Sequence, residues 1–380
     1  MAERLQDLTT PCLILDRQRL ARNIARMNDR IARLGVALRP HVKTCKSIEV
    51  SRLAAAGHSG AIAVSTLAEA QFFALAGFTD ILYAVGIVPS KLPDVAALNA
   101  GGDSIKVVLD DPRTARELAR WGVRNGVQIP ALIEIDSDGR RAGLDPDDPA
   151  VIEAASTLAD SPGTRFLGVM THAGASYDCR TTDAIRDMAA QEARAVVAAA
   201  ENLASAGLPC TIVSVGSTPT ALFADALDGI TEVRAGVYMF FDLFQVGLGV
   251  CGIDDIAVSV LATVIGHNPR LNRLIVDAGA LALSQDRATA GQITDQGYGL
   301  VCDAQTVAPI HGMTVQSVNQ EHGLVTMASG KLDFDRFSIG SQLRILPNHA
   351  CMTAASHQAY HVVEAPGGPA TEEWPRCGGW

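Results

Sequence analysis

Eight short apolar runs, alternating with amphipathic stretches, constrain the fold of this chain more than any other feature. The runs are rich in Val, Ile, Leu and Thr, and they lie at 36–42, 61–65, 80–85, 105–109, 130–136, 165–171, 211–215 and 231–235. Nearly continuous apolar strands suit a parallel sheet that is buried on both faces. Eight strands separated by helices indicate a TIM-type (β/α)8 barrel. A doubly wound open sheet is the rival, but no G-x-G-x-x-G follows the first strand.

Helical patterns fill the intervals between these runs. The clearest one follows Asp16, a candidate N-cap, and places apolar residues at 20, 24, 27, 31 and 34, which are spaced by three and four. An Ala-rich stretch over 182–207 begins at Thr181 or Thr182. Further helices are expected near 66–77, 111–125 and 147–160.

The sequence pattern changes after about residue 250, where long helical stretches end. Runs at 257–265, 272–277, 323–328, 338–346 and 359–364 are β-like and separated by turn residues. We therefore predict a barrel domain over 16–250 and a second, mostly β domain over 251–380, joined by the N-terminal residues 1–15. The segments 367–370 and 377–380 are expected to be loose.

Composition excludes several classes of partner. The formal net charge is −10, and charges of both signs are interspersed without a basic patch, so nucleic acid is not an expected partner. The eight cysteines form no C-x-x-C pair and no disulfide framework. No apolar run reaches the roughly 18–20 residues that would span a membrane, and no signal pattern opens the chain. These features predict a cytoplasmic protein without membrane contact.

Active residues of a barrel lie just past the C-terminal ends of its strands, and Lys43 follows the first strand. Partial burial and neighbouring cations at such a rim lower the pKa of a lysine, which frees the neutral amine to form an imine. The alternative is a solvated loop lysine, and Lys46 is a competing candidate.

Small residues follow the seventh and eighth strands. The backbone N–H groups of Gly216-Ser217-Thr218 and of Gly236-Val237 are free to point at an anion, in the place where barrels commonly bind phosphate. The alternative is two ordinary turns between strand and helix.

Three ionisable residues lie on the same rim. Arg234 is placed to face the ring nitrogen of a cofactor, and Arg141 is placed to reach a phenolate or a carboxylate. Either arginine could equally form an ion pair on the rim. His172, after the sixth strand, could serve as a general base or a substrate ligand, although a single histidine there is often structural.

The β domain contains an imidazole and a thiol two residues apart, His349 and Cys351. On an extended segment, residues i and i+2 point the same way, so both could bind one ion. Nitrogen with sulfur favours Zn²⁺ over Mg²⁺ or Ca²⁺. Two protein ligands leave positions for water and substrate, which suits a catalytic site, but H-x-C alone is a weak signal.

Six motifs in the same order resemble fold-type III pyridoxal-phosphate enzymes, in the D-serine dehydratase-like and D-threonine aldolase-like branch with an alanine-racemase-type barrel. They run from about residue 9 to the C-terminus and are RPHVKTCKS around Lys43, THAGASY at 171–177, VGSTPTA at 215–221, EVRAGVYMFFD at 232–242, QEHG at 320–323 and LPNHAC at 346–351.

The resemblance implies roles for particular residues. Lys43 would hold pyridoxal 5'-phosphate as a Schiff base, and Arg234 would contact its pyridine nitrogen and keep it unprotonated. His349 and Cys351 match the zinc ligands of the dehydratases, although Mn²⁺ and Co²⁺ are not separated from Zn²⁺ by two ligands. The remaining residues expected around the cofactor are Arg141, His172, Ser217, Thr218, Gly236, Val237 and Tyr238.

The activity implied is dehydration of a D-3-hydroxy amino acid, such as D-serine or D-threo-3-hydroxyaspartate, to a 2-oxo acid and ammonia. The alternative is retro-aldol cleavage of D-threonine to glycine and aldehyde. The aldolases of this group carry an aspartate where Cys351 stands and a tyrosine where His172 stands, so dehydration is favoured. Racemases lack the H-x-C pair, and small non-catalytic cofactor carriers lack a β domain. By analogy alone, a homodimer is expected.

Overall fold

The computed structural model describes residues 3–101 and 104–380 and divides the chain into two compact units. One unit comprises Arg26–Gly236 with Cys377–Trp380, and the other comprises Met1–Ala25 with Val237–Arg376. Residues 1–2, part of the predicted segment 1–15, lie outside the described residues.

The first unit is built on a parallel sheet of eight strands in the order β2-β9-β8-β7-β6-β5-β4-β3. A bridge between His41 and Ala63 joins the two ends of this order, so the sheet is a nearly closed barrel. The predicted barrel and all eight predicted strands are confirmed. The strands are β2 Ala37–Pro40, β3 Ile62–Val64, β4 Asp80–Gly86, β5 Ser104–Leu109, β6 Ile129–Ile135, β7 Thr164–Thr171, β8 Ile212–Val215 and β9 Glu232–Ala235.

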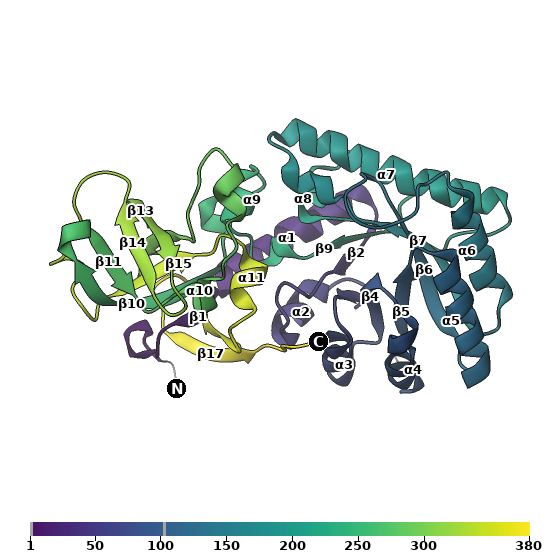
Figure 1. Cartoon of the computed structure of the whole chain (residues 1–380), viewed down its shortest axis with the longest axis horizontal. Helices are drawn as coiled ribbons and strands as arrows, with labels where there is room; N and C mark the ends of the chain where they lie inside the picture. Colours follow the sequence, from purple (N-terminus) through teal and green to yellow (C-terminus); the bar gives the residue numbers. More distant parts are fainter. Residues whose placement is uncertain (1–2, 102–103) are drawn as a thin grey trace. The chain divides into compact units, whose positions relative to one another are not determined.

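Helices connect the strands, and α5, α6 and α7 pack together beside β6 and β7 (Figure 1). Two predicted N-caps are confirmed: the Asp16 carboxylate accepts the Arg19 N–H at 2.9 Å, and Thr181 accepts the N–H of Ala184. The sequence did not predict α2, α4 and α8, which are short. The helices are α1 Arg17–Leu34, α2 Ile48–Ala55, α3 Leu67–Leu75, α4 Leu92–Ala100, α5 Pro112–Asn125, α6 Pro149–Asp160, α7 Thr182–Ser205 and α8 Thr218–Phe223.

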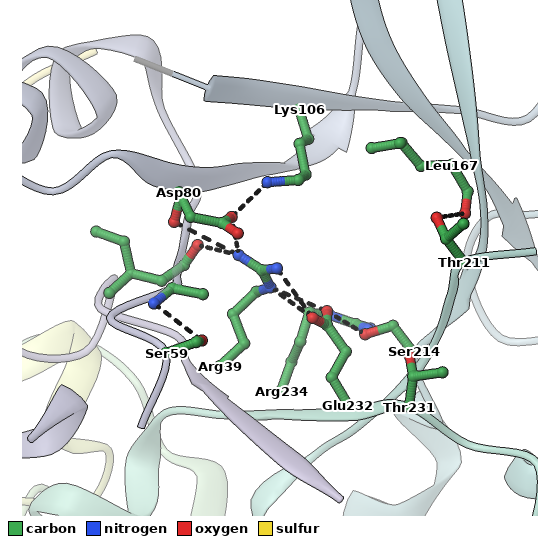
Figure 2. A network of polar contacts seen from close by, with 12 residues as sticks. Arg39, Ser59, Asp80, Lys106, Leu167, Thr211, Ser214, Thr231, Glu232 and Arg234 are labelled. Carbon is green, nitrogen blue, oxygen red and sulfur yellow. Dashed lines mark hydrogen bonds and ion pairs between the residues drawn. The ribbon is translucent and has the colours of Figure 1, made fainter. Parts of the chain in front are cut away.

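The interior of the barrel is partly apolar and partly charged. Leu82 and Val108 belong to a buried apolar cluster, and on the same strands Asp80 and Lys106 lie two residues earlier, so they point to the same side. Arg39, 3% exposed, meets them there (Figure 2). Ion pairs therefore fill space that the apolar strand pattern alone would assign to aliphatic side chains.

The second unit contains a six-stranded barrel in the order β11-β14-β13-β12-β15-β10, closed by pairing of β10 with β11. The mostly β second domain is therefore confirmed. The predicted loose tail is partly wrong, because residues 370–375 form a strand that pairs with β16. The barrel strands are β10 Val258–Asn268, β11 Arg273–Val276, β12 Leu300–Asp303, β13 Pro309–Val318, β14 Gly323–Met327 and β15 Gln342–Leu346, and the sheet continues through β1 Cys12–Asp16, β16 Ala359–Val363 and β17 Ala370–Pro375.

Two further findings concern the cysteines and the helices. None of the eight cysteines forms a disulfide. Among the described residues, no helix combines the length and apolar character needed to cross a membrane.

Helix α5 touches the turn before β7 through two glycines, which generates a prediction about stability. A Cβ on Gly122 would lie 2.1 Å from the Gly163 carbonyl oxygen. Helix propensity alone would make Gly122→Ala stabilising by about 1 kcal/mol. We expect the opposite sign, a loss of about 1–3 kcal/mol, because backbone must move. Chemical denaturation measures this difference, with Gly86→Ala as control because nothing lies within 4 Å of that position. A more stable Gly122→Ala chain would contradict the packing.

Candidate active site

Two lysines compete for the role at the end of β2, and their surroundings separate them. Lys46 forms an ion pair with Glu69 at 3.1 Å, and the Glu69 side chain is 1% exposed. The N–H of Ser65 donates to the same carboxylate at 2.8 Å, which fixes it in place. An ammonium engaged with a buried carboxylate is a poor nucleophile. Lys46 is therefore a structural residue, and Lys43 remains the candidate.

Lys43 itself is exposed, which corrects the expected partial burial. Lys43 and Arg234 both act on His41: burial lowers the pKa of His41 well below its ordinary value, and the charges of Lys43 and Arg234 act in the same direction. An exposed amine beside a buried positive cluster is open to an anionic aldehyde that arrives from solvent.

The turn that carries Lys43 packs against Gly236. A Cβ on Gly236 would lie 2.6 Å from the His41 carbonyl oxygen and 2.8 Å from Thr44 Oγ1. Only glycine allows the backbone after β9 to approach this turn so closely. The glycine therefore holds the turn of Lys43 against the backbone after β9, where the family resemblance places the phosphate of the cofactor.

His172 follows β7 and is held in one tautomer. Its Nδ1 lies 2.6 Å from the carbonyl oxygen of Gly216, which can only accept, so Nδ1 carries the proton. Burial, opposed by that hydrogen bond and reinforced by the charges of Arg141, Lys43 and Arg234, lowers the pKa of His172 to about 3. The imidazole is therefore neutral at physiological pH, with a lone pair on Nε2 that can accept a hydrogen bond.

The N–H groups after β8 are not free, which corrects the reasoning behind the predicted phosphate site. The N–H of Gly216 donates to Glu192 Oε1 at 2.9 Å, and the N–H of Ser217 donates to Thr220 Oγ1 at 3.1 Å. The Ser217 hydroxyl lies 3.0 Å from that of Ser176. Binding of phosphate by Ser217, Thr218, Gly236 and Val237 stays a prediction, but it cannot rest on the amides of Gly216 and Ser217.

Glu192, on α7, is a site residue that the sequence reasoning missed. It is 1% exposed, and its Oε1 accepts the N–H groups of Ala173 and Gly216, each at 2.9 Å. Burial raises the pKa of this carboxyl, and these hydrogen bonds oppose the rise. Glu192 therefore fastens the loop after β7 to the loop after β8, which sets His172 against Gly216. The sequence feature that could have identified Glu192 is an acidic residue within the Ala-rich stretch predicted as a helix.

The two predicted arginines, Arg234 and Arg141, differ in their exposure and in their contacts. Arg234 is 4% exposed and donates to the Ser214 hydroxyl (Figure 2). It also donates to the Thr171 carbonyl. The Arg141 side chain is 60% exposed, and its nearest ion pair, with Glu134, spans 3.9 Å. Arg234 is thus fixed by the barrel, whereas Arg141 is an exposed charge at the rim.

Tyr238 is fully buried in the 3-10 turn η4, Val237–Met239, and lies with Val237 in the second unit. The structure does not test its predicted contact with a cofactor.

His349 and Cys351 meet, but for a different reason than predicted. His349 caps the short helix α11, Ala350–Ala354, and Cys351 lies in its first turn, so they do not share an extended segment. His349 Nδ1 lies 2.6 Å from Asp286 Oδ2. Burial disfavours the imidazolium, but hydrogen bonds with Asp286 and Cys351 prevail and raise the pKa of His349 to about 11.

This pair fits a divalent cation. An imidazole that is so readily charged lies in a negative environment, and Asp242 adds a further buried carboxylate beside it. A carboxylate that holds Nδ1 of a histidine is a common arrangement behind a metal ligand. The sequence reasoning missed Asp286, 63 residues away in the chain. Among the described residues, no group of three or more His, Cys, Asp and Glu side chains is arranged around one point.

A cavity of about 600 Å³ in the β domain contains none of the predicted residues. It is lined by β11, β13, β14 and the loop at 294–296. The candidate site is therefore identified by its side chains rather than by this cavity.

Comparisons with known proteins give the family. Residues 15–243 match the model of the alanine racemase N-terminal domain, and residues 257–363 match that of a serine dehydratase domain. A D-threo-3-hydroxyaspartate dehydratase from Delftia sp. (strain HT23) is 49% identical, over 100% of both chains. A D-serine dehydratase from Dictyostelium discoideum is 34% identical, over 94% of both chains.

Solved structures agree with these matches. That of D-threo-3-hydroxyaspartate dehydratase from Delftia sp. HT23 has a TM-score of 0.96 with 48% identity, covering 100% of both chains. That of D-threonine aldolase from Filomicrobium marinum has a TM-score of 0.84 with 27% identity, covering 99% of this chain and 96% of the other. The chain therefore belongs to the alanine racemase-like, fold-type III family of pyridoxal-phosphate-dependent enzymes, in the branch whose barrel is followed by a serine dehydratase domain.

Proposed function

We propose that this chain is a lyase that dehydrates D-3-hydroxy amino acids, such as D-threo-3-hydroxyaspartate or D-serine, to a 2-oxo acid and ammonia. The observation that carries this proposal is the His349–Cys351 pair, backed by Asp286, in a chain that is 49% identical to a dehydratase over its whole length. The pair would hold a divalent ion, which would act as a Lewis acid on the substrate hydroxyl.

The chain's residues divide the work of binding and proton transfer. When bound, pyridoxal phosphate supplies an electron sink for the substrate Cα, and a divalent ion supplies Lewis-acid assistance to the departing hydroxide. Lys43 would hold the cofactor aldehyde covalently until substrate takes its place, and its freed Nζ would then remove the proton on Cα. His349 and Cys351 would hold the ion.

Arg234 and His172 would act through where they lie relative to the cofactor and the substrate. Buried Arg234 remains a cation, which disfavours protonation of a ring nitrogen placed against it. Neutral His172, with Nε2 as its free acceptor, would bind the substrate near Lys43.

The metal is proposed to be zinc. An imidazole nitrogen with a thiolate sulfur is a donor pair that Zn²⁺ favours, with Mn²⁺ and Co²⁺ as the alternatives. A solved structure of a variant of a D-threo-3-hydroxyaspartate dehydratase is described as being in the metal-free form, which supports a metal in that relative.

We also propose a homodimer. Leu281 and Met352, on the contacting helices α10 (Ala280–Leu283) and α11, are about half exposed, at 50% and 49%, and Met352 adjoins Cys351. Apolar side chains exposed beside a polar site favour a covering partner, here a second copy. Sedimentation equilibrium at twice the chain mass would support this state, and a single-chain mass would exclude it.

The retro-aldol alternative is kept because the chain also resembles a D-threonine aldolase over nearly its whole length. In that reaction His172 Nε2 would take the proton of the β-hydroxyl instead. A product assay on D-serine, D-threonine and D-threo-3-hydroxyaspartate separates the two reactions. Ammonia with a 2-oxo acid supports the proposal, and glycine with an aldehyde overturns it.

The two lysines give opposite expectations. Lys43→Ala is expected to abolish the visible absorption band that pyridoxal phosphate gives on the loaded chain, because the covalent link is lost. Lys46→Ala is expected to keep the band and to lower the melting temperature, because Glu69 loses its partner in a buried position. Absorption spectra and thermal melts measure both. The reverse pattern of bands would assign the cofactor to Lys46.

Cys351→Ala is expected to lose the metal and at least about 100-fold in activity while keeping the cofactor, because the metal ligands and Lys43 are separate groups. Elemental analysis and the visible band measure the two contents independently. Cys210→Ala is the matched control, since this free thiol lies in the barrel unit. Full activity in metal-free Cys351→Ala would show that the thiol has no part in the reaction.

A further inference from the structure

Arg234 belongs to a chain of polar contacts that crosses the barrel interior (Figure 2). Its Nη1 donates to Ser214 Oγ on β8, and its Nη2 donates to the Thr171 carbonyl at the end of β7. A guanidinium has five N–H donors, more than these two bonds use, so Arg234 can serve a further acceptor while it is held.

The direction of the contacts at Ser214 follows from its single proton. The Ser214 hydroxyl donates to Glu232 Oε1 at 2.7 Å, so its lone pair is left to accept from Arg234. Ser214 is 0% exposed, and water cannot replace either partner. The orientation of the hydroxyl, and with it the position of Nη1, therefore depends on Glu232.

Glu232 is kept ionised by Arg39. Burial would raise the pKa of Glu232, but the charge and hydrogen bonds of Arg39 lower it. Arg39 contacts this carboxylate through Nε at 2.9 Å and through Nη2 at 2.9 Å. Its Nη1 contacts Asp80 at 2.6 Å, and Lys106 contacts the same aspartate.

The network carries surplus positive charge. Three cations, Arg39, Lys106 and Arg234, face two carboxylates, Asp80 and Glu232, which leaves a net +1 (three minus two). Both carboxylates contact Arg39 directly, whereas Arg234 reaches Glu232 only through Ser214. Within these five groups the surplus lies at the Arg234 end, and Glu134 and Glu192 act on Arg234 from outside them. The other titratable groups that influence Arg234 or are influenced by it are Glu134, Glu192, His41 and His172.

We propose that Ser214 and Glu232 are positioning residues that fix the guanidinium of Arg234 as an oriented cation for the ring nitrogen of the cofactor. This inference rests on the proposed function, because Arg234 serves a ring nitrogen only if pyridoxal phosphate binds here. It goes beyond that function by assigning the orientation of Arg234 to two residues that do not contact the ligand themselves.

The test removes the middle hydroxyl and follows the cofactor rather than turnover. Ser214→Ala is titrated with pyridoxal phosphate, and the visible band is recorded at each concentration and across pH 6–10. We expect affinity to fall about tenfold, because a buried hydrogen bond to a charged group is lost, and the pH midpoint of the band to shift. Ser214→Thr keeps the hydroxyl and is expected to retain the wild-type midpoint.

Thr211→Val is the matched control. It removes a hydroxyl just before β8 that donates to the Leu167 carbonyl and makes no contact with the network. We expect this variant to stay within about twofold of wild-type affinity. Thermal melts show whether each variant is folded, and Ser214→Thr with an unchanged melt but an altered midpoint also overturns the proposal.

Two further outcomes are decisive. A folded Ser214→Ala chain with wild-type affinity and midpoint overturns the positioning role while leaving the proposed function intact. A wild-type chain that forms no visible band with pyridoxal phosphate overturns both.

Discussion

Arg39 lies where the barrel closes, and its guanidinium joins strands from both sides of the seam. It pairs with Glu232 on β9, donates to the Ile62 carbonyl on β3 at 3.3 Å, and pairs with Asp80 on β4. The seam itself has few ladder hydrogen bonds, since His41 and Ala63 form an isolated bridge between β2 and β3. Removing one partner of a buried ion pair typically costs about 3–5 kcal/mol, because the other charge is left uncompensated. The closed barrel therefore depends on this cation.

The same seam positions the proposed chemistry. Lys43 follows Arg39 by four residues, and Arg234 lies directly opposite Arg39 in the register of β2 and β9. Two adjacent guanidinium groups are tolerated because Glu232 lies between them, with Arg39 on one side and Ser214 on the other. A network that stabilises the barrel thus also leaves a positive charge near Lys43, where an anionic cofactor gains most from it.

Local sequence patterns predicted the strands and most helices, but they did not predict contacts between residues far apart in the chain. Near-continuous apolar runs predicted all eight barrel strands, and side-chain oxygens at Asp16 and at Thr181 or Thr182 predicted two helix starts, because those signals lie within a few residues. Glu69, Glu192 and Asp286 were missed because each acts on residues 19 to 63 positions away, and no local spacing encodes such a contact. His349 and Cys351 were predicted together for the wrong geometry: a helix start, rather than an extended segment, brings them close.

The central claim is that Lys43, rather than Lys46, is joined to the aldehyde of pyridoxal phosphate. Borohydride reduction of the loaded chain makes such a link permanent, and peptide mass mapping then locates it. The account predicts one pyridoxyl group per chain on Lys43, with Lys46 unlabelled because it is paired with Glu69. A pyridoxyl group on Lys46, or on any other lysine in place of Lys43, would contradict it.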